Sequence, residues 1–98
     1  MRLYALIAAV SLAAPALAQS KEEVTLVYAY VVGTAGHCGI DINMTKAGNY
    51  AKTFGLDAAA VGAQTWEAQQ LVYTLDGRAL DEWCQVIEDS VAELGLGK

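Results

Sequence analysis

Residues 79–94, ALDEWCQVIEDSVAEL, decide the fold of this chain. Apolar side chains recur there at steps of three and four, a spacing that places them along one stripe of an α-helix. The stripe consists of Leu80, Trp83, Cys84, Ile87, Val91 and Leu94, and the polar positions between them include Asp81, Glu82, Gln85, Glu88, Asp89 and Glu93. The stretch therefore predicts an amphipathic helix that turns Cys84 toward a core.

The N-terminus has the pattern of a cleaved secretion signal. Arg2 precedes an uncharged apolar run over 3–12, which is shorter than the roughly 20 residues that span a bilayer. Pro15 then precedes Ala16-Leu17-Ala18, a small-residue cleavage pattern. We expect residues 1–18 to be a cleaved signal peptide, which makes the mature protein periplasmic or secreted and leaves no membrane segment. Of the 98 residues, 80 then remain, 19–98, as a single helical domain.

A disulfide between Cys38 and Cys84 follows from this setting. These are the two cysteines of the chain, and export exposes them to an oxidising compartment. A domain of this size builds only a marginal core, so small exported domains commonly carry a covalent cross-link. In the chain-entropy model, closing so long a loop stabilises the fold by about 4 kcal/mol.

The segment 24–32 is ambiguous between helix and strand. Val24, Tyr28, Val31, Ala35 and Cys38 step by four and three, as on one helical stripe. The same segment is rich in β-branched and aromatic residues, which favour strands. The chain contains no second strong strand with which it could pair, so we favour a helix and leave the strand as the alternative.

Two further helices are expected between these segments. Met44, Ala47, Ala51 and Phe54 form an apolar stripe that Gly55-Leu56 ends as a left-handed cap. Asp57 is a suitable N-cap for the next helix, whose stripe consists of Val61, Thr65, Ala68, Val72 and Leu75. Gly62 interrupts that helix, which indicates a break or a close helix crossing.

These elements predict an all-α fold, a small antiparallel bundle of about four helices that is stapled by one disulfide. The mature chain has five basic and eleven acidic residues, a net charge of −6. An acidic surface with scattered lysines repels nucleic acid and anionic lipid, because both require clustered Lys and Arg. We therefore expect neither as a partner.

No constellation of residues indicates catalysis. His37-Cys38 resembles a nucleophile with its base, but neighbouring residues of a helix point about 100° apart and Cys38 has a disulfide partner. A soft-metal site that adds Met44 and Cys84 to this pair would have one histidine and two oxidised sulfurs. We therefore expect no enzyme, no metal and no cofactor, and keep a thiol- or metal-dependent activity at His37 and Cys38 as an alternative.

The candidate binding residues are Tyr30, Trp66 and His37. Tyr30 and Trp66 do not fit the main apolar stripes, so one or both are candidates for a partner surface. Trp66 also lies seven residues before Tyr73, which places both on one side of the predicted helix. The expected function is a small exported binding module whose partner is another protein or a second copy of the chain.

In layout the chain resembles the small periplasmic acid-stress chaperones of enteric bacteria, the HdeA/HdeB type. The resemblance consists of a cleaved signal, one helical domain of this size, and the placement of Cys38 and Cys84. That family has a Trp before its first cysteine, whereas His37 precedes Cys38 here and Trp83 precedes the second cysteine. The resemblance implies a dimer that opens in acid and binds unfolding proteins, so an acid-activated holdase is the alternative function.

Overall fold

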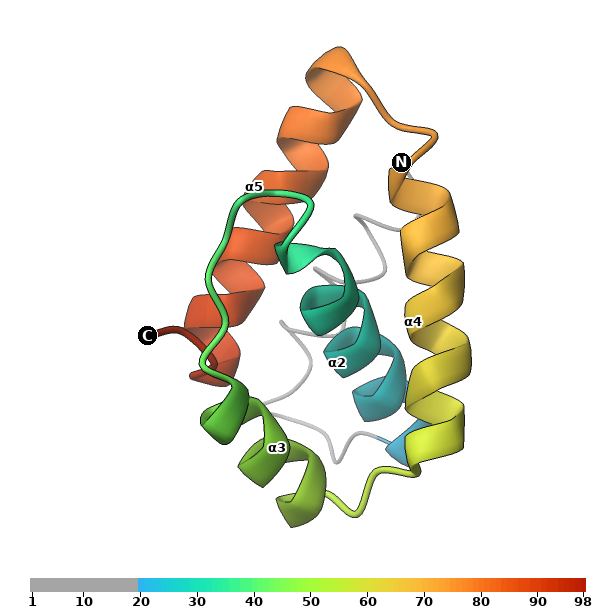
Figure 1. Cartoon of the computed structure of the whole chain (residues 1–98), viewed down its shortest axis with the longest axis vertical. Helices are drawn as coiled ribbons and strands as arrows, with labels where there is room; N and C mark the ends of the chain where they lie inside the picture. The colour runs from blue at the N-terminus through green and yellow to red at the C-terminus, as the bar shows by residue number, and fades with distance from the viewer. Residues whose placement is uncertain (1–19) are drawn as a thin grey trace.

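The computed structural model describes residues 20–98, and in this part of the chain it contains four α-helices (Figure 1). These are α2 (Lys21–Ala35), α3 (Met44–Thr53), α4 (Ala58–Val72) and α5 (Gly77–Leu94). The predicted all-α fold of four helices with a disulfide is confirmed. The predicted signal peptide over 1–18 lies outside the described residues.

The central helix is α2. It contains the segment 24–32, for which the sequence favours a helix and leaves a strand as the alternative. It begins after Ser20, whose hydroxyl accepts a hydrogen bond from the backbone N–H of Glu23 at 3.2 Å. Its two buried threonines, Thr25 and Thr34, each donate their hydroxyl to the carbonyl four residues earlier at 2.7 Å. Apolar residues lie on most sides of α2 because other elements surround this helix.

The chain direction alternates from helix to helix, but the pair that packs most extensively is parallel (Figure 1). α2 lies between α4 and α5, and α3 carries the chain back toward the end at which α2 began. Gly33 accordingly lies against Thr65, and His37 beyond the end of α2 contacts Tyr73 at the end of α4. α5, the other helix that packs closely on α2, is antiparallel to it.

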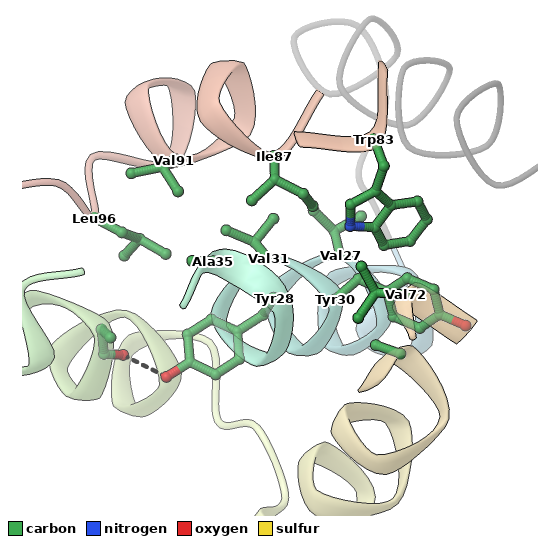
Figure 2. Packing of buried hydrophobic residues seen from close by; sticks show 12 residues of the cluster. Val27, Tyr28, Tyr30, Val31, Ala35, Val72, Trp83, Ile87, Val91 and Leu96 are labelled. Carbon is green, nitrogen blue, oxygen red and sulfur yellow. Dashed lines mark hydrogen bonds between the residues drawn. The ribbon is translucent and has the colours of Figure 1, made fainter. Parts of the chain in front are cut away.

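The core forms where α2 meets the predicted stripe of α5 (Figure 2). Val31 of α2 and Ile87 of α5 are fully buried, and Val72 of α4 is 1% exposed. Trp83 and Val91 continue the α5 side of the same core. The buried cluster is Val27, Tyr28, Tyr30, Val31, Ala35, Ala47, Ala68, Val72, Trp83, Ile87, Val91 and Leu96.

The close crossing of two helices occurs at Gly33 and not at Gly62. A Cβ built on Gly33 would lie 2.9 Å from Cγ2 of Thr65, so only glycine allows α2 and α4 to approach this closely. A Cβ on Gly62 would meet no atom within 4 Å, and α4 runs through this residue without a break. Both expectations for Gly62 are therefore wrong, because this residue faces solvent.

Three helical segments end in the same hydrogen-bonded motif. At each end a glycine with positive φ, namely Gly39, Gly55 or Gly95, precedes an apolar residue. The backbone N–H of that apolar residue bonds to a carbonyl five residues earlier, Ile40 to Ala35, Leu56 to Ala51 and Leu96 to Val91. This is the Schellman motif, in which the glycine adopts a conformation that L-residues disfavour. The cap that the sequence predicts at Gly55-Leu56 is confirmed.

The segment after α5 closes the remaining side of the core. Leu96 is 1% exposed, and its carbonyl accepts the backbone N–H of Asn43 at 2.8 Å. Ile42 and Gly97 form an isolated antiparallel bridge, and Nζ of Lys46 donates to the Gly97 carbonyl at 3.1 Å. These contacts fasten the start of α3 to the end of the chain.

Two predicted details differ in the structure. Met44 and Phe54, expected on the buried stripe of α3, are 68% and 49% exposed, because this short helix presents only its middle to the core. α5 begins at Gly77, two residues before the stretch 79–94 that predicts it. Among the described helices, none has the length and apolarity needed to cross a membrane.

Candidate functional site

The disulfide joins the turn after α2 to the middle of α5. Cys38 and Cys84 are bonded, with their Cα atoms 5.4 Å apart and a separation of 46 positions in sequence. Cys38 lies beyond the end of α2, three residues after Ala35, and both cysteines are half-buried. The described part of the chain contains no free thiol. The predicted pairing is therefore confirmed.

Tyr30 lies in the core and is only 7% exposed. Its ring centroid is 6.0 Å from that of Trp83, whose indole N–H donates to the Thr34 hydroxyl at 3.0 Å. Burial raises the pKa of the Tyr30 hydroxyl, and the negative charge of Glu67 raises it further. In this fold the Tyr30 ring therefore packs against Trp83 and leaves little surface for a partner.

His37 lies on the surface, in the turn that carries Cys38. Its imidazole meets the ring of Tyr73 edge-on, with 5.1 Å between the centroids. Because Sγ of Cys38 is bonded to Cys84, no thiolate is present for His37 to activate. Within residues 20–98, no three His, Cys, Asp or Glu side chains gather in a way that could hold a metal ion.

Trp66 and Tyr73 belong to one exposed side of α4. They are 64% and 69% exposed, although both are large aromatic residues. Seven residues span almost two full helical turns, so the two rings lie on the same side, about 10 Å apart along the axis. We call this side the α4 outer face and define it by Ala59, Gly62, Trp66, Gln70 and Tyr73, all of which are exposed.

The α4 outer face is nearly free of charge in an acidic molecule. Glu67 is the only charged residue of α4, and it lies about 100° around the helix from Trp66. By contrast, all eleven carboxylates of the chain are exposed, and five of them line the solvent side of α5. Those five are Asp81, Glu82, Glu88, Asp89 and Glu93. The neutral α4 outer face thus differs from the rest of the surface.

A second aromatic group connects α2 to α3. The rings of Tyr28 and Tyr50 stack at 5.5 Å, and the ring of Phe54 follows 4.6 Å from that of Tyr50. The Tyr28 hydroxyl donates to the Ala47 carbonyl at 2.9 Å (Figure 2), and burial raises the pKa of both tyrosines. Because only Phe54 at its end is well exposed, this group mainly holds α3 in place.

A shallow open groove of about 310 Å³ lies between the first turns of α2 and α4. Lys21, Thr25, Asp57 and Gln64 are among the residues that line it. The Thr25 hydroxyl already donates to the Lys21 carbonyl, and an Asp57 carboxylate oxygen accepts the Ala60 backbone N–H at 2.9 Å. Two polar side chains of the groove therefore already form hydrogen bonds within the first turns of α2 and α4.

Of the three predicted binding residues, the structure places Trp66 on the α4 outer face, His37 beside Tyr73 at the end of that face, and Tyr30 in the core. Tyr73 was not among the three. Its spacing of seven from Trp66 was the signal that could have added it. Comparison with protein-family models, curated proteins and solved structures gives no match for this chain.

Proposed function

We propose that this protein is a small non-enzymatic binding module that contacts another protein through the α4 outer face, with His37 at the edge of the contact. The observation that carries the proposal is the exposure of Trp66 and Tyr73 on one side of one helix. Tryptophan and tyrosine are enriched among the residues that dominate binding energy at protein interfaces.

The energetics favour a partner for these rings. Each aromatic side chain can bury about 150–250 Å² of surface, and removing apolar surface from water is worth roughly 25 cal/mol per Å². Folding does not bury these two rings, because other residues such as Trp83 fill the core. Covering Trp66 and Tyr73 therefore contributes to binding and not to folding.

The surroundings of the α4 outer face indicate a protein partner. The chain carries a net charge of −5, and no lysine or arginine of residues 20–98 belongs to this face, so a polyanion such as nucleic acid finds no complementary charge there. A binding role also agrees better with the geometry of His37 and Cys38 than thiol chemistry does. The sulfur is bonded to Cys84 and the imidazole contacts Tyr73.

Site-specific photo-crosslinking in the cell that makes the protein tests this proposal. A photoreactive phenylalanine analogue replaces Trp66 in one variant and Glu88, on the solvent side of α5, in the control. We expect discrete adducts from position 66 and none from position 88. Equal adducts from both positions, or none from position 66, would contradict the proposal.

An acid-activated chaperone is a second candidate, and a specific observation supports it. All eleven carboxylates are exposed, so acid reaches them while the core is still closed. The net charge of 19–98 then rises from −6 toward about +6, and the resulting repulsion favours an open form. Dye binding and suppression of client aggregation near pH 3, about one unit below the ordinary carboxyl pKa, decide this; a compact, inactive protein there would exclude it.

A further inference from the structure

We infer that the α4 outer face binds a second copy of this chain, with the two α4 helices antiparallel about a two-fold axis at Trp66. The inference rests on the proposed function, because it uses the same face and names its occupant. It is carried by the spacing and the size of the exposed residues and by the charge of the surrounding surface.

The exposed residues of the α4 outer face are spaced symmetrically. Ala59, Gly62, Trp66, Gln70 and Tyr73 are separated by three, four, four and three residues. In a two-fold interface the same patch contacts itself, so that residue i of one copy meets residue j of the other and the reverse. An antiparallel copy centred on Trp66 therefore places position 59 opposite position 73, and position 62 opposite position 70.

Side-chain sizes on the face are complementary under this operation. The N-terminal half carries Ala59 and Gly62, and a Cβ added to Gly62 would meet no atom of its own chain within 4 Å. The C-terminal half carries the longer Gln70 and the large Tyr73, which is 69% exposed. The antiparallel arrangement sets Tyr73 and Gln70 of one copy over Ala59 and Gly62 of the other, and the two Trp66 rings meet at the axis. A parallel arrangement would also set Tyr73 against Tyr73 and leave the small residues uncovered.

Charge favours this face over the solvent side of α5 as the contact between identical acidic chains. Two copies repel each other through α5, whose solvent side carries five carboxylates. α4 has one carboxylate, Glu67, which borders the face without entering it. The two copies therefore meet with less repulsion along α4 than along α5.

The dimensions of α4 predict a weak dimer. A helix of 15 residues is about 22 Å long, so one of its faces covers less than the roughly 800 Å² per partner of a standard interface. We expect the population of dimer to change with protein concentration in the micromolar to millimolar range. Added salt should increase it, because salt screens the repulsion between the acidic chains.

Sedimentation equilibrium on the disulfide-bonded protein tests the contact. We expect Trp66→Ala and Ala59→Arg each to weaken self-association by more than about ten-fold, the loss typical of a central interface residue. Ala92→Arg is the matched control, because Ala92 is an exposed alanine of α5 and the substitution changes the net charge equally. A wild-type chain that is monomeric throughout the range, or an Ala92→Arg effect as large as that of Ala59→Arg, would overturn the inference.

Cross-linking between differently labelled copies tests the register. A copy with Ala59→Cys is mixed with a copy with Tyr73→Cys under conditions that leave the native disulfide intact. We expect mixed dimers to form well before either homodimer, because two copies of position 59 lie about 21 Å apart across the axis. Equal rates for mixed and identical pairs would contradict the antiparallel register.

The two proposals fail in different ways. If photo-crosslinking from position 66 yields adducts with another protein while sedimentation finds only monomer, the second copy is excluded and the binding function stands. If position 66 yields no adduct of any kind in the cell, the proposed binding function falls and this inference falls with it, even where the purified chain associates at high concentration. If position 66 yields no adduct and the purified chain stays monomeric, the proposed function and the dimer are both overturned.

Discussion

The indole N–H of Trp83 donates a hydrogen bond to the hydroxyl of Thr34, across 3.0 Å between α5 and α2. Thr34 is fully buried, and its own hydroxyl proton goes to the Tyr30 carbonyl. Trp83 directly precedes Cys84, so this polar contact and the disulfide fix the same part of α5 to α2 and to the turn that follows it.

Replacing the threonine tests this contact. Thr34→Val keeps the shape of the side chain but removes an acceptor for Trp83, so we expect a loss of about 1–2 kcal/mol in the free energy of unfolding. Denaturation in urea measures the loss. In a Trp66→Phe background the fluorescence comes from Trp83 alone and should change its emission maximum. Thr53→Val, at an exposed position, is the control and should change stability by less than about 0.5 kcal/mol.

Removing the disulfide should cost most of the stability of the fold. For a loop closed over 46 residues, the chain-entropy model gives about 4 kcal/mol, close to the roughly 5 kcal/mol expected for a small domain. We expect the Cys38→Ser and Cys84→Ser double variant to be largely unfolded by circular dichroism at 37 °C. Wild-type protein treated with reductant should behave in the same way. A loss below about 1 kcal/mol would contradict the prediction.

The helix crossing predicts opposite effects for two glycines. Gly33→Ala places a Cβ 2.9 Å from Cγ2 of Thr65, so we expect a destabilisation of about 1–3 kcal/mol although alanine favours helix. Gly62→Ala meets no neighbour and should stabilise by about 0.5–1 kcal/mol. Thermal unfolding measures both changes. Thr65→Ser removes Cγ2 and should recover much of the Gly33→Ala loss; a failure of this rescue would mean that another contact is responsible.

The buried tyrosines predict loss of stability at high pH. Burial raises the pKa values of Tyr28, Tyr30 and Tyr50, so the folded protein holds these protons more tightly than the unfolded chain does. Their contribution is complete below the ordinary tyrosine pKa of about 10 and is lost as the pH rises through the higher values of the folded state. Urea midpoints between about pH 8 and about pH 12 should therefore fall steeply above pH 10.

Two tyrosine variants give the control for this pH dependence. Tyr28→Phe loses the hydrogen bond to Ala47 and should be less stable at neutral pH, but its stability should fall less steeply at alkaline pH. Tyr73→Phe, at a 69% exposed position, should retain the wild-type slope. A slope that is unchanged in Tyr28→Phe would exclude Tyr28 as a source of the alkaline loss.

The amphipathic helix could be predicted from the sequence because it depends on a local pattern, and the disulfide could be predicted because the chain has two cysteines and the expected export exposes them to an oxidising compartment. The stripe around Trp83 and Ile87 is bounded by charged residues, so its period is clear. α2 carries little such contrast, because it is covered by both α4 and α5, and a helix surrounded by core loses the alternation that reveals a buried face.

The packing of the helices could not be predicted in the same way. Periodicity reports which side of a helix is apolar but not which partner covers it, so the parallel pairing of α2 with α4 and the crossing at Gly33 appear only in three dimensions. The same holds for the candidate site. Trp66 could be predicted because it lies off the main apolar stripe of its helix. Tyr30 also lies off the apolar stripe of its helix, but its ring packs in another part of the core, beside Trp83.

The burial of Leu96 has a consequence for the timing of folding. This side chain occupies the core only after α5 has ended, and its carbonyl holds the start of α3 through Asn43. A chain that lengthens from its N-terminus must therefore include Leu96 before this side of the hydrophobic interior can close. We expect a chain shortened to residue 95 to be cut by proteases more readily than the full sequence, because it leaves that side of the interior open to water.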